Sequence, residues 1–581
     1  MADKVSLKCA IDPENVSFLL GPRDFYDTLC DLYGNATKRI VLASLYVGCG
    51  ELEEELIRTI LRTKERNKDI TVDILVDKAR TDRVGKGVTL VTPLTILQKY
   101  LAPGSRVNVN LFHNPLLGAL CGKIFKPPYC EAFGTMHMKV YIGDDRCIIT
   151  GANTGRDYFC DRCDRYIVMK DPLFCDAMHT FVKLFQTASY TLTEKLTVEW
   201  LSDFANPLED NVLFRKQLCV RAREMVLMCR NILEKQWVNV NGNGYGSSAA
   251  DFSDYDAWIM SGGNSNNTVD AFNACNGEPI NEKCINKEGK HGYYTGEGDE
   301  NASTHSGGGS NVSCHLNGTV GKSSVTHRYT TPRDAVRNPD KGGKEKEYFY
   351  IKICLQMPFS DPPFVQGENL LDEWILRYVK NGYSILIATA YLNFTERFMN
   401  VINQAIKIGQ GVGKKNPVQV VTASPQANTW FNDVDLKRKI ALFYSSSAMW
   451  MLQSMKNEKG YPADVYMEYN RPKHTFHAKG VWALKDRVSI DMAHSSEEEF
   501  NEATDLPLSM IIGSSNYSRR SVAKDLEVIF FVETNSEKLR KFMRREIYEM
   551  VKYSDYVPYS SVRSRVGLGL ITGWHVMKEF L

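Results

Sequence analysis

The sequence predicts an α/β protein built from two related halves, each a mixed β-sheet flanked by helices, that meet in a pseudo-twofold arrangement around one shared site. Two observations lead to this fold class. A strand–helix–strand pattern occurs once in each half of the chain, and a motif of the form H-x-K follows it each time. The length of 581 residues, with 43% hydrophobic and 24% charged residues, allows several globular domains and excludes a fibrous or wholly disordered chain.

The first pattern lies between residues 35 and 80. The apolar run RIVLASLYV, from Arg39 to Val47, predicts a buried strand. The stretch ELEEELIRTILRTKE at 51–65 predicts an amphipathic helix, because its apolar residues recur at three- and four-residue spacing. A second apolar run, ITVDILVD at 70–77, predicts a strand parallel to the first, since a helix connects the two.

The second pattern repeats the first between residues 383 and 428. The runs YSILIATAYLNF and VQVVTASPQAN predict parallel strands, and TERFMNVINQAIKIG between them predicts a helix. The first strand of each pattern ends in a similar sequence, ASLY at 43–46 and ATAY at 388–391. We therefore interpret the two halves as products of a duplication.

The composition changes between the two halves, from about Val238 to Glu345. This stretch is rich in Asn, Gly, Ser and Thr and has too few large apolar residues to offset the entropy of ordering it. We expect an N-terminal domain at 1–237, a disordered low-complexity insertion at 238–345, and a C-terminal domain at 346–581.

Charge and composition limit the classes of function that the chain can have. The 71 Lys and Arg residues nearly balance the 69 Asp and Glu residues, so no global field favours non-specific binding to nucleic acid, and any anionic ligand must be held by a local cluster. The 15 irregularly spaced cysteines favour a reducing compartment over a disulfide framework. No apolar run reaches the length of a transmembrane helix, and the first residues do not resemble a signal or transit peptide.

Each half carries polar residues in the same order. The first set is His137, Lys139, Asp144 and Asn153, and the second is His477, Lys479 and Asn516. Beyond each Asn the halves align without a gap, which matches Arg156 with Arg519 and Asp164 with Glu527. Two matched sets in one chain are stronger evidence for a functional site than either set alone.

These residue types suit a phosphodiester. His and Lys two apart on a strand share a face, so packing of the two halves would bring both pairs and both amides to one cleft. Lys and Asn would bind the non-bridging oxygens, while one His attacks phosphorus and the other protonates the leaving group. The carboxylates of Asp164 and Glu527 would fix the imidazole tautomers. This chemistry requires neither a metal ion nor a cofactor.

At these residues the sequence resembles the phospholipase D superfamily, whose motif is H-x-K-x(4)-D-x(6)-G-x-x-N. The first half fits the motif through Asp144 and ends in a shortened G-x-N at Gly151 and Asn153. The second half has Leu484 where the motif has Asp, and it ends in GSSN, which adds Ser514 to the expected phosphate-binding residues.

Within that superfamily the chain resembles the eukaryotic phosphatidylglycerophosphate synthases. The segments that carry this resemblance include ASLYVGCGELEEEL, NLFHNPLLG, HMKVYIGDD, TFHAKGVWAL and GSSNYSRRSVAKDLE. The resemblance implies transfer of a phosphatidyl group from CDP-diacylglycerol to glycerol-3-phosphate, through a phosphatidyl-histidine and with retained configuration at phosphorus. We favour His137 as the nucleophile and His477 as the acid and base.

The same resemblance implies a mitochondrial enzyme that faces the matrix at the inner membrane. Two stretches suit peripheral contact with lipid, PLLGALCGKIFKPP at 115–128 and the C-terminus from Val562, although core packing explains either of them equally well. The acceptor is an anion and needs further cations to select it over water. Four arginines are candidates by position: Arg156, Arg165, Arg519 and Arg520.

Three alternatives remain open. A cardiolipin synthase of the phospholipase D type would use phosphatidylglycerol as the acceptor. A phosphodiesterase acting on nucleic acid is disfavoured by the near-zero net charge and by the lack of a basic groove interleaved with aromatic residues. A catalytically inactive lipid-binding protein is disfavoured by the two intact H-x-K motifs. The oligomeric state cannot be deduced from the sequence.

Overall fold

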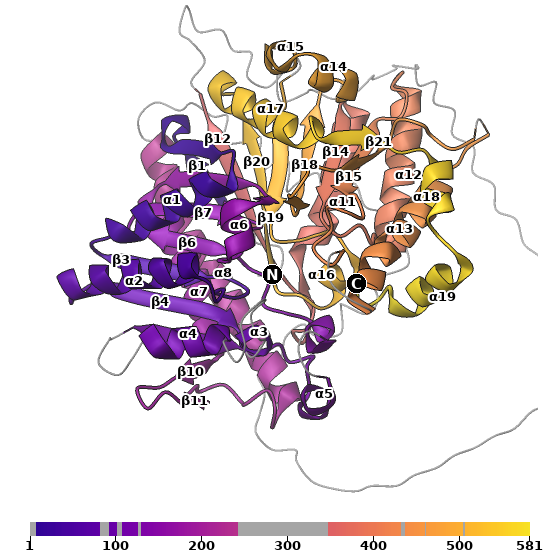
Figure 1. The fold of residues 1–581 in the computed structure, drawn as a ribbon. Helices are drawn as coiled ribbons and strands as arrows, with labels where there is room; N and C mark the ends of the chain where they lie inside the picture. The colour runs from indigo at the N-terminus through magenta and orange to yellow at the C-terminus, as the bar shows by residue number, and fades with distance from the viewer. Residues whose placement is uncertain are drawn as a thin grey trace, which may run out of the picture. The chain divides into compact units, whose positions relative to one another are not determined.

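Two large mixed β-sheets, each covered by helices, lie side by side in the computed structural model (Figure 1). They belong to one compact unit. The structure describes residues 7–81, 92–100, 107–125, 129–241, 347–431, 436–458, 460–502 and 506–581. The predicted α/β class, with mixed sheets flanked by helices, is confirmed.

The first sheet has nine strands in the order β11-β10-β5-β4-β3-β6-β7-β9-β2. The strands β3, β4 and β5 are parallel, and the pairs on the β6 side are antiparallel. The bounds of the nine strands are β2 Val16–Leu19, β3 Arg39–Ala43, β4 Thr71–Asp77, β5 Asn108–Phe112, β6 Val140–Gly143, β7 Arg146–Thr150, β9 Tyr166–Lys170, β10 Tyr190–Leu192 and β11 Val198–Glu199.

Helices cover both faces of this sheet. Along β3, Ile40 and Leu42 pack in the same apolar cluster as α1 and α2, whereas Val41 and Ala43 pack with α7, as the alternation of side chains along a strand requires. The helices of the first half are α1 Pro22–Gly34, α2 Glu51–Arg66, α3 Lys78–Thr81, α4 Pro93–Tyr100, α5 Ala119–Ile124, α6 Arg156–Cys160, α7 Pro172–Thr187 and α8 Asn211–Asn241, with short 3-10 turns at Pro13–Asn15 and Tyr129–Phe133.

The second sheet follows the order β1-β12-β20-β19-β18-β14-β15-β16-β21, and β13 pairs with β12 at its side. The strands β14, β15 and β16 are parallel. The bounds are β1 Leu7–Ile11, β12 Phe349–Met357, β13 Phe364–Val365, β14 Ser384–Thr389, β15 Val418–Ala423, β16 Tyr466–Tyr469, β18 Gly480–Leu484, β19 Ser509–Gly513, β20 Glu527–Thr534 and β21 Ser554–Tyr556.

The helices of the second half follow the same α/β pattern. The predicted strand–helix–strand unit is present as β14, α12 and β15, and the N-terminus of α12 is capped by Thr395, whose hydroxyl accepts from the N–H of Phe398. The helices are α11 Gln366–Lys380, α12 Glu396–Gly411, α13 Leu436–Ser454, α14 Ile490–Ser495, α15 Glu497–Glu502, α16 Arg519–Ala523, α17 Glu537–Val551, α18 Tyr559–Ser564 and α19 Leu568–Met577.

The two sheets share the order of their central strands. The path β4-β3-β6-β7-β9 in the first sheet corresponds to β15-β14-β18-β19-β20 in the second. The strand β1, close to the N-terminus, joins the sheet of the C-terminal half, where it pairs antiparallel with β12. The two halves of the chain are therefore joined through β1 as well as through their packing.

The predicted insertion at 238–345 lies almost wholly outside the described residues. The helix α8 extends to Asn241, four residues into that segment, and the description resumes at residue 347, just before β12.

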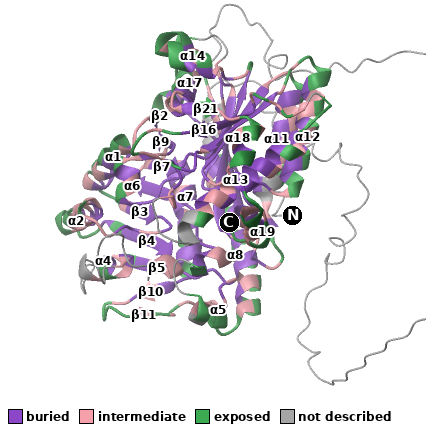
Figure 2. Cartoon of the chain, turned by 45° about the vertical axis from the view of Figure 1, so that its right-hand side comes forward, coloured by how far each residue is buried: buried purple, intermediate pink, exposed green. Residues whose placement is uncertain are grey.

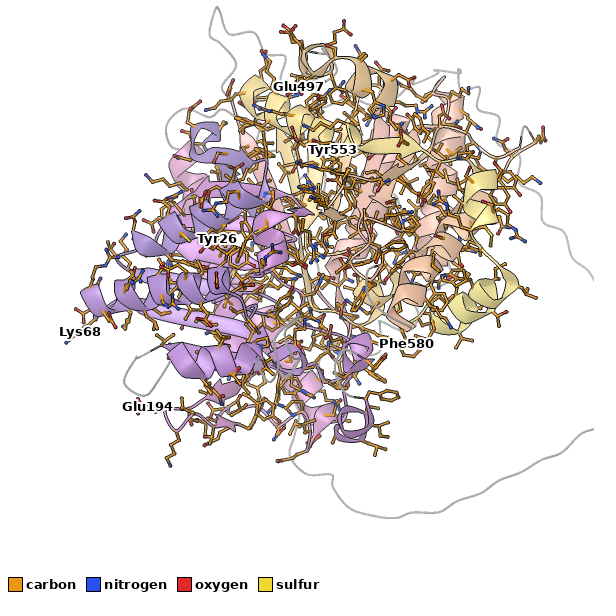
Figure 3. The ribbon with its side chains drawn as sticks, in the orientation of Figure 1. Tyr26, Lys68, Glu194, Glu497, Tyr553 and Phe580 are labelled. Atoms are coloured by element: carbon orange, nitrogen blue, oxygen red, sulfur yellow. The ribbon has the colours of Figure 1, made fainter. Side chains whose placement is uncertain are left out.

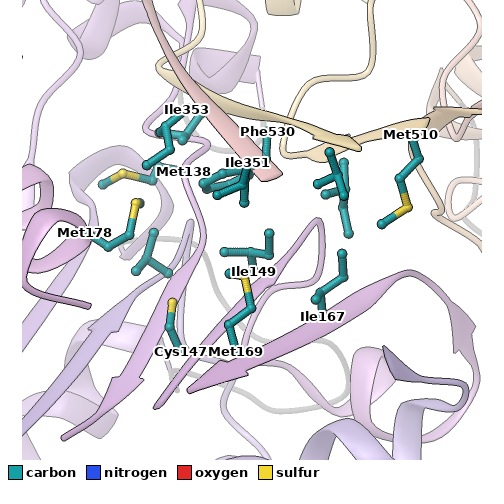
Figure 4. Close-up of a cluster of buried hydrophobic side chains, with 14 of the residues drawn as sticks. Met138, Cys147, Ile149, Ile167, Met169, Met178, Ile351, Ile353, Met510 and Phe530 are labelled. Carbon is teal, nitrogen blue, oxygen red and sulfur yellow. The ribbon is translucent and has the colours of Figure 1, made fainter. Parts of the chain in front are cut away.

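A continuous apolar core fills the space between the two sheets. Figure 4 shows Ile149, Ile167 and Met169 from the first sheet facing Ile351, Ile353 and Phe530 from the second, and all six are buried. Close packing of this kind resists relative movement of the halves. The site described below lies where the halves meet, so its two parts are held in fixed positions.

Charged side chains cover the outside of the molecule. Figure 2 shows exposed residues on the outer helices around a buried interior, and Figure 3 shows Lys68, Glu194 and Glu497 projecting outward. Among the described helices, none combines the length and the apolar character that crossing a bilayer requires.

Candidate active site

The two H-x-K motifs lie at the junction of the halves, in extended segments just before β6 and β18. Each segment forms a short parallel bridge to the opposite half. The N–H of His137 donates to the carbonyl of Leu526 at 2.9 Å, and the N–H of His477 donates to the carbonyl of Cys163 at 2.8 Å. The second bridge is the strand pair β17 (Thr475–Phe476) with β8 (Arg162–Cys163). The motifs therefore precede the strands on which the sequence predicted them.

Each imidazole is held by a carboxylate from the other half. The Nδ1 atom of His137 lies 3.1 Å from both carboxylate oxygens of Glu527, and Nδ1 of His477 lies 2.7 Å from Oδ2 of Asp164. All four side chains are buried. A carboxylate that accepts an Nδ1 proton leaves the lone pair of the neutral ring on Nε2.

The two lysines lie beside their histidines. Nζ of Lys139 donates to the carbonyl of His137 at 2.6 Å, and Nζ of Lys479 lies 2.6 Å from Nδ1 of His477 and donates to its carbonyl. Burial lowers the pKa of Lys139 well below its usual value and lowers the pKa of Lys479 to about 8. Two buried ammonium groups create a strong preference for an anion.

The two asparagines leave acceptor atoms inside the protein. Among the described residues, neither Oδ1 of Asn153 nor Oδ1 of Asn516 has a hydrogen-bond partner, although both side chains are buried. Nδ2 of Asn153 donates to the hydroxyl of Tyr158 at 3.0 Å, and that hydroxyl lies 3.2 Å from Nε2 of His477. Buried polar atoms without partners are rare, so these two acceptors stand out within the site.

Burial shifts the pKa values of the ionisable groups in the site. Burial lowers the pKa of both imidazoles, and the nearby ammonium groups lower it further. Burial also raises the pKa of Asp164 to about 6 and raises the pKa of Glu527. The hydroxyl of Ser514 accepts from the N–H of Val528 at 3.2 Å and lowers the pKa of Glu527. Neutral imidazoles next to cations are suited to attack on an anionic centre.

The structure does not bring Asp144 to this site. The residue lies in the turn between β6 and β7, where its carboxylate accepts from the N–H groups of Thr37, Lys38 and Arg39. It connects this turn to the start of β3, and it touches neither imidazole. The carboxylate at this position of the motif therefore stabilises the sheet.

The four candidate arginines lie in different surroundings. Arg165 is buried and donates to Glu546 and to the carbonyls of Lys479 and Ile511, which makes it a link between the halves. Arg156 is largely exposed and faces Asp161. Arg519 pairs with Glu396 and Glu579.

Arg520 is a candidate whose charge acts on one of the two histidines. Its Nε pairs with Asp525 at 3.0 Å, and its charge lowers the pKa of His137.

The sequence did not single out several residues that surround the site. Tyr158 and Arg162 lie next to His477, and the guanidinium of Arg162 stacks on the ring of Tyr158 at 4.4 Å. Tyr391, at the end of the repeated sequence ATAY, contacts His477 edge to face at 5.8 Å. The matched sequences ASLY and ATAY were the feature of the sequence that could have identified residues such as Tyr391. Among the described residues no group of three or more His, Cys, Asp or Glu is placed to hold a metal ion.

Sequence relatives cover nearly the whole chain. The chain is 24% identical over 565 residues to a Gallus gallus protein named CDP-diacylglycerol--glycerol-3-phosphate 3-phosphatidyltransferase, mitochondrial, which spans 95% of this chain and 80% of that protein. It is 24% identical over 572 residues to a Schizosaccharomyces pombe protein with the same name without the word mitochondrial, across 95% of this chain and 91% of that protein. No family model matches the chain.

A solved structure shares the fold. The phosphatidylserine synthase of Haemophilus influenzae superposes with a TM-score of 0.56 and 14% identity, and the match covers 100% of this chain and 98% of that one. The strand order and the paired halves described above therefore belong to a fold that a solved structure already shows.

Proposed function

We propose that this chain, a homologue of the CDP-diacylglycerol--glycerol-3-phosphate 3-phosphatidyltransferases with a phospholipase D fold, transfers a phosphatidyl group from CDP-diacylglycerol to glycerol-3-phosphate and releases CMP. The observation that carries the proposal is the pair of crossed contacts, His137 with Glu527 and His477 with Asp164. Two oriented imidazoles at one buried junction can act as the nucleophile and the base of a two-step displacement at phosphorus.

The reaction divides into two displacements. In the first, Nε2 of one imidazole attacks the phosphorus that bears the diacylglycerol, and CMP leaves. In the second, the 1-hydroxyl of glycerol-3-phosphate attacks the phosphatidyl-histidine while the other imidazole takes its proton. Each step inverts phosphorus, so the product retains the configuration of the substrate.

The lysines and asparagines stabilise the transition states. The ammonium groups of Lys139 and Lys479 carry the charge that a phosphoryl group developing negative charge requires, in a site shielded from water. Asn153 and Asn516 donate from their amides, and Ser514 orients the backbone next to Glu527. Arg520, whose charge acts on His137, is the cation that we assign to the phosphate of glycerol-3-phosphate.

A lipid substrate requires access from a membrane. The segment around α5 and the C-terminal residues meet through ring contacts of Phe133, at 5.3 Å to Phe125 and 6.2 Å to Phe580. Phe133 lies four residues before His137. The same two segments carry exposed apolar side chains: Leu120 and Ile124 on α5, Phe125 directly after it, and Val576 on α19. Peripheral contact with lipid at this face, in mitochondria and at the matrix side of the inner membrane, completes the proposal.

Release of CMP tests the proposal. The full chain is supplied with CDP-diacylglycerol in mixed micelles containing EDTA, with and without glycerol-3-phosphate, alongside His137→Ala and His477→Ala. We expect CMP release that depends on the acceptor, a phosphatidylglycerophosphate product, and loss of steady-state turnover in both variants. A preference for phosphatidylglycerol as the acceptor would assign a cardiolipin synthase instead. Turnover that survives in both variants would remove the proposal.

A further inference from the structure

The two halves of the site align without a gap but differ in charge or polarity at several positions, among them Asp157 against Arg520 and Asp161 against Lys524. In the gap-free register beyond Asn153 and Asn516, Tyr158 corresponds to Ser521 and Arg162 corresponds to Asp525. The first pair lies on the matched short helices α6 and α16. The second pair lies two residues before the carboxylates that hold the imidazoles. Arg162 and Asp525 therefore place opposite charges at matched positions near the two histidines, and each is paired with a residue of the other sign, Asp157 and Arg520.

The ring nitrogens of His477 have three polar neighbours. Nδ1 lies 2.7 Å from Oδ2 of Asp164 and 2.6 Å from Nζ of Lys479. Nε2 lies 3.2 Å from the hydroxyl of Tyr158 and 3.1 Å from the same Nζ. The amide of Asn153 donates to that same hydroxyl, which leaves the phenolic proton for the imidazole. At the matched position the other half has Ser521, whose hydroxyl accepts from the N–H of Asn516 instead.

Cations reinforce the neutral state of His477. Arg162 donates from Nε to the hydroxyl of Thr475, two residues before His477, and its other end pairs with Asp157 at 2.7 Å. Burial lowers the pKa of His477, and the charges of Lys479 and Arg162 lower it further. Burial and these two charges therefore disfavour protonation of the ring, whereas the carboxylate of Asp164 favours it.

His137 has an additional carboxylate in place of that arginine. Asp525 accepts from the N–H and the hydroxyl of Thr135, two residues before His137, at 2.8 and 3.1 Å. Its charge raises the pKa of His137, against the lowering by burial, Lys139 and Arg520. Glu527 adds a second carboxylate at Nδ1. His137 therefore has a carboxylate at the matched position where His477 has a guanidinium, and this difference favours a proton on His137 relative to His477.

We infer that His477 is the nucleophile and that His137 is the general acid and base. The assignment rests on the proposed transfer reaction and reverses the order that the sequence favoured. Nε2 of His477 forms the bond to phosphorus, the bond from phosphorus to CMP breaks with its electron pair, and His137 supplies a proton to the departing oxygen. The acceptor hydroxyl then gives its proton to His137, its oxygen bonds to phosphorus, and the electron pair of the P–N bond returns to His477.

The two roles differ in what their loss prevents. A phosphate monoester such as CMP leaves with little help from an acid, whereas an alkyl hydroxyl needs a base to attack. His137→Asn should therefore complete the first step and stop at the second. The His477→Asn variant should not carry out even the first step.

The test is a rapid-quench measurement of CMP release from CDP-diacylglycerol in mixed micelles, with wild type, His137→Asn and His477→Asn at micromolar enzyme. The quench is alkaline because a P–N bond is stable in base, and the protein is then digested and mapped by mass spectrometry. We expect His137→Asn to release about one CMP per chain in a burst and then to turn over about 10²–10⁴-fold more slowly than wild type. We expect the phosphatidyl group on the peptide that contains His477.

The opposite pattern would overturn the assignment: a burst in His477→Asn, no burst in His137→Asn, or the phosphatidyl group on the peptide of His137. Mapping of the wild-type adduct without acceptor needs no substitution and decides the question if a variant fails to fold. Wild type that releases no CMP even with acceptor would instead remove the proposed function itself. The two failures are thus distinguishable.

Discussion

The guanidinium of Arg165 and the carboxylate of Glu546 form a buried ion pair, with Nε and Nη2 at 2.8 and 2.9 Å from the two oxygens. The same guanidinium donates to the carbonyl of Lys479 and stacks on the ring of Trp482 at 4.0 Å. Arg165 comes from the first half of the chain, and its partners come from the second. The residue that follows the imidazole-binding Asp164 therefore joins the halves directly behind the active site.

Removal of this link should destabilise the protein strongly. Arg165→Ala leaves Glu546 charged and buried without its partner, and we expect the free energy of unfolding to fall by about 3–5 kcal/mol. Chemical denaturation followed by circular dichroism measures the change. Arg156→Ala is the control, because that side chain is largely exposed and should change stability by about 0.5 kcal/mol or less. Equal effects in the two variants would contradict the structural role of Arg165.

Asp144 should act on stability rather than on chemistry. Asp144→Ala removes the acceptor of three backbone N–H groups at the start of β3, so we expect a loss of about 1–3 kcal/mol in unfolding free energy. The neighbouring Asp145→Ala removes only a surface pair with Lys38 and Arg39 and should cost about 1 kcal/mol or less. Asp144→Ala should keep the wild-type dependence of kcat/KM on pH. A change in that profile would mean that Asp144 acts on the reacting groups.

The pH dependence of kcat/KM should be bell-shaped. Asp164 has its pKa raised to about 6, so below that pH its carboxylate is protonated and no longer accepts the Nδ1 proton of His477. Lys479 has its pKa lowered to about 8, so above that pH its positive charge is lost. Activity should therefore fall as the pH drops through about 6 and also as it rises through about 8.

Two substitutions assign these limbs. Asp164→Asn should remove the acid limb, since an amide does not titrate, and Lys479→Arg should move the alkaline limb upward, since a guanidinium stays charged. Initial rates at low substrate concentration between pH 5 and 10 give the profiles. An acid limb that persists in Asp164→Asn would assign it to a different group.

The apolar face next to Phe133 should govern access to lipid in vesicles. Leu120 on α5 is 70% exposed, and Leu120→Glu should weaken binding to anionic lipid vesicles about 10- to 100-fold, because insertion of one leucine is worth about 1.5–3 kcal/mol. Co-sedimentation with vesicles measures the change. Leu227→Glu, at an exposed leucine of α8, is the control and should bind as wild type does. Equal loss in both variants would argue against a specific membrane-facing surface.

Local patterns predicted much of the fold. The strand–helix–strand units appear as β3, α2, β4 and as β14, α12, β15, within a few residues of the predicted bounds. Apolar periodicity fixes such units because it depends only on neighbouring residues. The sheet that receives β1 could not be predicted, since its partner β12 lies more than 300 residues away and its short sequence LKCAI fits any apolar sheet edge.

The site was predictable in its residue types and not in its pairings. The matched motifs identified both histidines, both lysines and the carboxylates Asp164 and Glu527, but the crossing of each carboxylate to the histidine of the other half depends on how the halves dock. Charge alone could not separate Arg165, which pairs with Glu546, from Arg520, whose charge acts on His137. Tyr158 was missed because an aromatic residue on a short helix has many structural uses.

The stereochemical course at phosphorus tests the central claim most directly. CDP-diacylglycerol with a single sulfur of known configuration at the phosphorus that bears the diacylglycerol is converted with glycerol-3-phosphate, and the configuration of the product is determined by phosphorus NMR. Two successive displacements through a histidine predict retention. Inversion would mean a single direct displacement by the acceptor and would contradict a covalent role for either imidazole.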